Sequence, residues 1–160
     1  MRRRHVSRRT FEVSSELAAD AAGVWAHAVS AQGVNRELAP LARMTLPGSA
    51  PVISPDSIVL GTRVLRSWIL LCGFLPVDYD DLTIVELEPG RRFLERSPML
   101  SQRIWQHERI VEPLAIGCRV TDRLAFEPKI EWMAPIYARV FTLVFRLRHR
   151  NLQRLFGKRR

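Results

Sequence analysis

Cysteine is scarce in this chain, which holds only Cys72 and Cys118 among its 160 residues. Two cysteines cannot form a four-cysteine zinc site, and they are too few for a scaffold that depends on disulfides. Both lie in apolar, strand-like runs. We therefore expect two buried free thiols and a reducing compartment.

Long apolar runs are missing as well. The longest apolar stretch without a charge, residues 67–77, is too short to cross a bilayer. The basic residues 1–4 are not followed by the apolar segment that a secretory signal peptide needs. We expect a cytoplasmic protein. Its length fits one domain, and an apolar fraction of 47% is enough for a hydrophobic core.

Acidic residues are absent from both ends of the chain. Residues 1–9 hold five arginines, and residues 132–160 hold seven arginines and one lysine. Because the whole chain carries +9, residues 10–131 must carry −4. A mildly acidic middle excludes a domain that binds nucleic acid over its whole surface, so no specific nucleic-acid partner is expected. The basic ends are compatible with contact to RNA or to an anionic membrane, and equally with simple solvation.

The common cofactor and nucleophile motifs are also absent. The sequence has no G-x-S-x-G elbow, no Walker loop and no dinucleotide-binding fingerprint. Asp78, Asp80 and Asp81 crowd one segment, but they lack the glycine and the distal glutamate of a calcium loop. We interpret this segment as a solvated turn. Neither a metal nor a cofactor is expected.

Alternating apolar and polar residues predict an antiparallel meander. The expected strands cover residues 10–14, 43–46, 62–72, 82–87, 92–97, 102–111 and 118–126. Two short helices are expected after the first strand. Ser14 or Ser15 caps the first helix, and Gly33 separates it from the second helix, at residues 35–41.

One long helix is predicted near the C-terminus, from Trp132 onward, with Pro135 in its first turn. The stripe expected to pack on the sheet consists of Ile136, Val140, Leu143, Val144 and Leu147. The order of a strand, two short helices, a meander and a terminal helix predicts an α+β helix-grip fold. In this fold a curved antiparallel sheet wraps around the long C-terminal helix.

The strongest chemical signal lies in the last two predicted strands. Trp105, His107 and Arg109 share one face of the first, and Asp122 lies on the apolar face of the second. An apolar hairpin face thus carries a histidine, an arginine and an aspartate. Two explanations account for them: a buried ion pair between strands that does no chemistry, or polar contacts to a ligand inside the curved sheet.

These residues resemble a pattern of the SRPBCC superfamily, the START and Bet v 1-like proteins with their polyketide cyclase and dehydrase-like branch. The ligand-binding branch often shows W-x-H-x-H, then T-x-x-D, a proline and a terminal F-x-x-R. Trp105 and His107 match the first part, and Arg109 replaces its second histidine. Thr121 and Asp122 keep the threonine–aspartate pair in a tighter spacing.

The resemblance extends over nearly the whole chain. The remainder of the pattern is matched by Phe126, Pro128 and residues 145–150. It implies a single helix-grip domain over residues 9–156. A basic N-terminal tail, residues 1–8, precedes this domain, and a basic C-terminal end, residues 157–160, follows it.

The resemblance implies that the chain binds a hydrophobic or aromatic small molecule, or a lipid, between the sheet and the C-terminal helix. The candidate ligand-binding residues are Trp68, Phe93, Glu95, Ser97, Trp105, His107, Arg109, Asp122 and Phe141. We expect Arg109 to meet an oxygen-bearing end of the ligand, because its planar set of donors matches a carboxylate or an enolate.

Two other functions stay open. The cyclase branch implies an enzyme that acts on a polyketide-type substrate, with His107 and Asp122 as acid–base groups. The third candidate is a non-catalytic interaction module that docks anionic partners through its basic ends. An enclosed volume on the order of several hundred Å³ would favour the first two functions, and a filled interior would favour the third.

Overall fold

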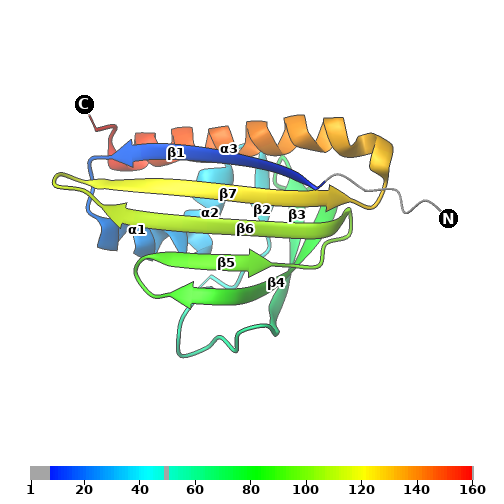
Figure 1. The fold of residues 1–160 in the computed structure, drawn as a ribbon, viewed down its shortest axis with the longest axis horizontal. Coiled ribbons are helices and arrows are strands. Elements are labelled where there is room, and N and C mark those ends of the chain that lie inside the picture. Colours follow the sequence, from blue (N-terminus) through cyan, green and yellow to red (C-terminus); the bar gives the residue numbers. More distant parts are fainter. Residues whose placement is uncertain (1–7, 49–50, 160) are drawn as a thin grey trace.

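The computed structural model of the protein describes residues 8–48 and 51–159. Its main element is a seven-stranded antiparallel sheet with the order β1-β7-β6-β5-β4-β3-β2. The strands are β1 (Arg9–Leu17), β2 (Ala42–Met44), β3 (Arg63–Leu71), β4 (Leu75–Glu88), β5 (Arg92–Arg96), β6 (Gln102–Pro113) and β7 (Cys118–Pro128). The sheet curls into a half-barrel, as Figure 1 shows.

Three α-helices complete the part of the domain that the structure describes. The short helices α1 (Ala21–Ala28) and α2 (Ala31–Leu38) follow β1, and a 3-10 turn (Glu131–Met133) leads into the long helix α3 (Ala134–Phe156). Helix α3 runs along the sheet beside β1 (Figure 1). This arrangement confirms the predicted helix-grip fold. In the part of the chain that the structure describes, no helix is long and apolar enough to cross a membrane.

The hairpin of β6 and β7 has the predicted alternation. Buried and more exposed residues alternate along β6, whereas β7 is exposed only at Arg119 and Arg123. The register places Arg109 directly opposite Asp122. Gly117 closes the turn with a φ of 76°, and a Cβ there would lie 2.0 Å from the carbonyl oxygen of Leu17. Only glycine fits this position, because both the backbone angle and the close approach exclude a side chain.

The first helices begin and end differently from the prediction. Ser14 and Ser15 lie in β1, and the cap of α1 is Asp20, whose carboxylate accepts a hydrogen bond from the Gly23 N–H at 2.9 Å. Gly33 lies in the first turn of α2 rather than between the helices, since its N–H donates to the Ser30 hydroxyl at 2.9 Å. Because β1 pairs with β7 as far as Leu17, the first helix begins later in the sequence than predicted.

The aspartate-rich segment is not a solvated turn, which corrects the prediction. Asp78, Asp80 and Asp81 all lie on β4 and are all buried. This strand begins at Leu75, earlier than its alternation suggested, because the whole segment pairs with β3. Cys72 also differs from the prediction: it lies exposed in the turn before β4, whereas Cys118 is buried.

Helix α3 does not bury its predicted apolar stripe. Ile136, Val140 and Leu143 are 48%, 45% and 61% exposed. The side chains that face the sheet and α2 include the buried Phe145, Arg148, His149, Asn151 and Leu152. The apolar stripe is open because the N-terminal half of α3 borders a cavity, whereas its C-terminal half packs against other elements.

Candidate ligand cavity and its polar network

A cavity of about 560 Å³ lies between the concave face of the sheet, helix α3 and the α1–α2 region. Most of its lining is aliphatic or aromatic, including Phe93, Trp105, Phe141 and Phe145. Exposed apolar side chains from the β3–β4 hairpin and α3, such as Leu71 and Leu143, also line it. The cavity therefore opens to solvent through an apolar rim.

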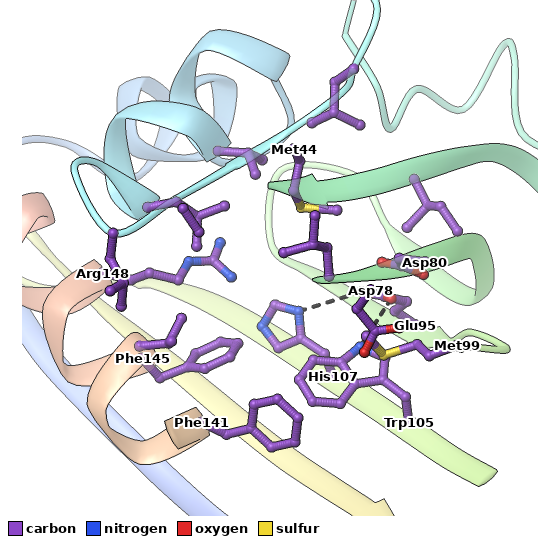
Figure 2. Close-up of a pocket in the computed structure, with 18 of the residues that line it drawn as sticks. Met44, Asp78, Asp80, Glu95, Met99, Trp105, His107, Phe141, Phe145 and Arg148 are labelled. Atoms are coloured by element: carbon purple, nitrogen blue, oxygen red, sulfur yellow. Dashed lines mark hydrogen bonds and ion pairs between the residues drawn. The ribbon is translucent and has the colours of Figure 1, made fainter. Parts of the chain in front are cut away.

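The acidic and basic side chains of the lining are few: Asp78, Asp80, Glu95, His107 and Arg148. Figure 2 shows Asp80 and Glu95 on one side of the cavity and Arg148 on the other, with His107 between them. An apolar pocket with a small number of polar groups is the usual composition of a small-molecule site.

Behind the cavity wall, Arg109 lies between two buried carboxylates. Its Nε and Nη2 donate to the two Asp122 oxygens at 2.8 and 2.7 Å, and its Nη1 and Nη2 donate to the two Glu37 oxygens at 2.7 and 2.9 Å. Burial opposes every one of these charges, but Arg109 lowers the pKa of both carboxyls, and the carboxylates raise the pKa of Arg109. Four hydrogen bonds to these carboxylates therefore engage all three of its guanidinium nitrogens within the protein.

His107 joins this buried network to the cavity. Its Nε2 lies 2.8 Å from Asp122 Oδ1, and its Nδ1 lies 3.5 Å from Glu95 Oε2. Burial opposes a charge on the ring, yet the carboxylates of Asp122 and Glu95 raise the pKa of His107 above its ordinary value. With a carboxylate at each nitrogen, the imidazolium form is favoured.

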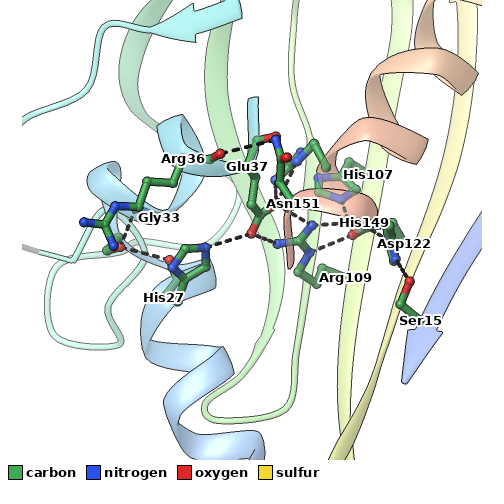
Figure 3. A network of polar contacts seen from close by, with 12 residues as sticks. Ser15, His27, Gly33, Arg36, Glu37, His107, Arg109, Asp122, His149 and Asn151 are labelled. Carbon is green, nitrogen blue, oxygen red and sulfur yellow. Dashed lines mark hydrogen bonds and ion pairs between the residues drawn. The ribbon is translucent and has the colours of Figure 1, made fainter. Parts of the chain in front are cut away.

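Helix α3 supplies further members of the network (Figure 3). Arg148 bonds the same Glu37 through Nε and Nη2, both at 2.8 Å, and its guanidinium lies 4.9 Å from the centre of the Phe145 ring. His149 bridges Asp122 Oδ2 at 2.9 Å and the Ser15 hydroxyl at 2.8 Å. Buried ions thus connect α2, α3, β6 and β7.

The three carboxyls of the cavity wall differ in their partners. Asp78 accepts hydrogen bonds from the N–H groups of Tyr79 and Ser101 and from the Ser101 hydroxyl. Glu95 accepts from the Ser97 hydroxyl at 2.6 Å and from the Trp105 indole at 3.2 Å.

Asp80 is different, because its buried Oδ1 has no hydrogen-bond partner among the described residues. Burial, followed by the charge of Glu95, raises the pKa of Asp80 well above its usual value. The surroundings of Asp80 thus favour the protonated form of this carboxyl in the cavity wall.

The structure separates the residues proposed from the sequence into two groups. Phe93, Glu95, Trp105, His107 and Phe141 line the cavity. The others lie outside the lining: Trp68, Ser97, Arg109 and Asp122.

Each of these four has a different place. Trp68 is 42% exposed and lies against Tyr79 with a ring-centre distance of 5.5 Å. Ser97 lies behind Glu95, to which it donates. Arg109 and Asp122 belong to the buried network, so the prediction that Arg109 meets the ligand does not agree with its position.

Sequence reasoning missed Glu37, Asp80 and Arg148. For Arg148 a signal was present: the F-x-x-R spacing of Phe145 and Arg148 places both on one helix face. For Glu37 and Asp80 we find no comparable signal. Among residues 8–48 and 51–159, no group of three or more histidine, cysteine or acidic side chains is arranged to hold a metal ion.

The basic ends are only partly described. Residues 1–7 and 160 lie outside the described residues, so most of the predicted basic tail, residues 1–8, does too. The predicted C-terminal end is held by β1: the Gly157 carbonyl accepts from the Ala18 N–H at 3.0 Å, and Arg159 pairs with Glu16 at 3.2 Å.

The sequence matches the family model described as "Domain of unknown function (DUF8410)" over residues 15–156. The chain belongs to this family. A search of curated proteins found no match.

Solved structures share the fold of this DUF8410 protein at low sequence identity. Protein CV1439 from Chromobacterium violaceum is similar with a TM-score of 0.68 and 15% identity, over 94% of this chain and 99% of that one. A START superfamily protein from Mycobacterium smegmatis has a TM-score of 0.67 and 10% identity, over 92% and 96%.

The di-domain ARO/CYC StfQ from the steffimycin biosynthetic pathway is also similar, with a TM-score of 0.59 and 13% identity, over 96% of this chain and 52% of that one. These neighbours confirm the SRPBCC fold that the residue pattern indicated.

Proposed function

We propose that this DUF8410 protein binds a hydrophobic or aromatic small molecule, or a lipid, in the cavity between the sheet and α3. The observation that carries the proposal is the cavity itself, about 560 Å³ with a largely apolar lining. Ligand pockets commonly enclose roughly 300–1,000 Å³. Such an open volume supports ligand binding over an interaction module with a filled interior.

Arg148, rather than Arg109 as first expected, is the arginine that contacts the ligand in this proposal. Two of its three guanidinium nitrogens bond Glu37, and Nη1 has no hydrogen-bond partner among the described residues. Arg148 also lines the cavity, whereas Arg109 does not. An oxygen acceptor on the ligand would therefore meet Arg148, because a guanidinium presents its remaining N–H groups in a fixed plane.

The test is to fill the cavity and measure apolar probe binding. Ala42 on β2 lines the cavity, and the next residue, Arg43, is exposed on the other side of the strand. We expect Ala42→Trp to weaken N-phenyl-1-naphthylamine, followed by its fluorescence, by roughly tenfold or more, about 1.4 kcal/mol. Arg43→Trp is the matched control and should bind the probe like the parent.

Two results would contradict ligand binding in this cavity. One is a parent protein that does not bind the probe at all, and the other is an Ala42→Trp variant that binds as well as the parent. Native mass spectrometry of the purified parent and of Ala42→Trp adds a direct check. A co-purified apolar molecule should be present in the parent and depleted in the variant.

The enzymatic alternative, with His107 and Asp122 as acid–base groups, has less support. Asp122 has no exposed surface and does not line the cavity, so its role would be to orient His107. A base needs a free lone pair, and both His107 nitrogens face carboxylates. Loss of a measured cyclisation in a His107→Gln variant that still binds the probe would restore this alternative.

A further inference from the structure

The acidic side of the cavity contains a carboxyl group with one oxygen that no described residue satisfies. Asp80 lines the cavity, is 5% exposed, and its Oδ1 has no hydrogen-bond partner among the described residues. Buried polar atoms without a partner are rare and costly, so each one calls for an explanation. A ligand donor is the explanation that the position of Asp80 favours.

The surroundings of Asp80 contain negative charge, and among the described residues no lysine, arginine or histidine forms an ion pair with Asp80. Glu95 on β5 and Asp78 on the same strand both contribute negative charge at Asp80. The cationic side chains nearby are already paired: His107 with Asp122 and Glu95, and Arg148 with Glu37. Arg66 pairs with Asp81, the next residue, which does not line the cavity.

We infer that the Asp80 side of the cavity, opposite Arg148, binds the protonated amine of a largely apolar ligand. The inference rests on the proposed function and gives the chemical class of the ligand's polar group. An alkylammonium offers three N–H donors, which suits a wall with carboxyls at Asp80, Asp78 and Glu95. A charged hydrogen bond in a buried site is also stronger than one from a hydroxyl group.

Binding of such a cation has a proton balance that can be measured. Without ligand, burial and the charge of Glu95 favour the protonated form of the Asp80 carboxyl. The ammonium group favours the ionised carboxylate, so Asp80 loses one proton to the buffer and the ligand keeps its own proton. We expect the amine to release protons, at most one per site, whereas an uncharged probe releases none.

The experiment uses four probes with the same ring system. They are 2-naphthylmethylamine, 2-naphthylmethanol, 2-methylnaphthalene and 2-naphthoic acid, each measured by displacement of N-phenyl-1-naphthylamine. We expect the amine to bind at least about tenfold more tightly than 2-methylnaphthalene, the effect of one charged hydrogen bond. Calorimetry in phosphate and in Tris gives the number of protons released.

The decisive variant is Asp80→Asn, with Asp81→Asn as the matched control on the other face of β4. Asp80→Asn should lose both the amine preference and the proton release but still bind 2-methylnaphthalene, which shows that the cavity is intact. Asp81→Asn should keep the preference.

The possible failures can be told apart. If 2-methylnaphthalene binds and the amine is no tighter, or if naphthoate binds most tightly, the inference is overturned and the proposed function stands. An amine preference that survives Asp80→Asn also overturns it. If no probe binds the parent, the proposed function fails together with the inference.

Discussion

Replacement of Arg109 by methionine should destabilise the protein strongly, even though Arg109 does not line the cavity. The guanidinium makes four hydrogen bonds of 2.7–2.9 Å to Glu37 and Asp122, and all three side chains are buried. Methionine keeps much of the apolar stem but removes the charge. Breaking a buried ion pair from one side costs about 3–5 kcal/mol, because it leaves an uncompensated charge.

Urea unfolding followed by tryptophan fluorescence measures this loss. With a denaturant slope of about 2 kcal/mol per M, the unfolding midpoint should fall by roughly 1.5–2.5 M. The control is Arg119→Met on β7, whose partner Glu16 lies 2.7 Å away in a largely exposed pair. That variant should stay within about 1 kcal/mol of the parent. If Arg109→Met were no worse than Arg119→Met, our account of the network would be wrong.

The same variant should change how stability depends on pH. Burial would raise the pKa values of Glu37 and Asp122, but the arginines outweigh it and lower both. The stability that these carboxylates contribute is present above their unfolded pKa of about 4 and is lost as pH falls through their folded values. In Arg109→Met the two pKa values rise, so the acid-induced loss of stability should become smaller.

Two further predictions concern Asp80 and the cysteines. Because the pKa of Asp80 is raised in the folded state, the folded protein holds a proton that the unfolded chain releases above about pH 4. As the pH rises above this value, the free energy of unfolding falls by up to about 1.4 kcal/mol per pH unit. Asp80→Asn removes this cost, so its gain in urea stability should grow as the pH rises above about 4. A gain that does not change with pH would contradict the raised pKa of Asp80. The exposed Cys72 should react with Ellman's reagent in the native protein, and the buried Cys118 should react only after unfolding. Burial also raises the pKa of the Cys118 thiol, which slows its reaction further. Two thiols that react in the native state would contradict the placement of the cysteines.

The sequence was most informative where local periodicity and tertiary contacts agree. The alternation in β6 and β7 predicted that Trp105, His107, Arg109 and Asp122 share the inner face, and all four are buried. A strand repeats every two residues, so one correct assignment of a face fixes the direction of every side chain along it.

Prediction failed where a contact depends on elements far apart in the chain. Glu37 looks like an ordinary surface residue of a short helix, and its partner Arg109 is 72 residues away. Periodicity describes one element at a time, so it cannot show that two charged faces meet. The same limit explains Asp80, whose burial follows from the pairing of β4 with β3 rather than from its polar neighbours.

Helix α3 shows a different limit of prediction from sequence, because its N-terminal half exposes apolar side chains and its C-terminal half buries polar ones. Near its start, the apolar Val140 and Leu143 border an open cavity and remain partly exposed. Near its end, Arg148, His149 and Asn151 are buried against the network and α2. The rule that apolar side chains are buried assumes a filled core. A protein with a binding cavity departs from this rule, since apolar side chains that border the cavity stay exposed and polar side chains behind it are buried.

This reversal has a consequence for how the cavity stays open. An unfilled apolar space is unfavourable, because the atoms that line it lose contacts on one side. Helix α3 could relieve that loss only by moving inward, but Arg148 and Asn151 hold its C-terminal half to Glu37 and to the Ala39 carbonyl of the α2 end. An inward movement of α3 would separate the buried charges of Arg148 and Glu37, whose hydrogen bonds require a fixed geometry. The ion network thus opposes collapse of the cavity, which accounts for a costly polar cluster placed directly behind a binding site.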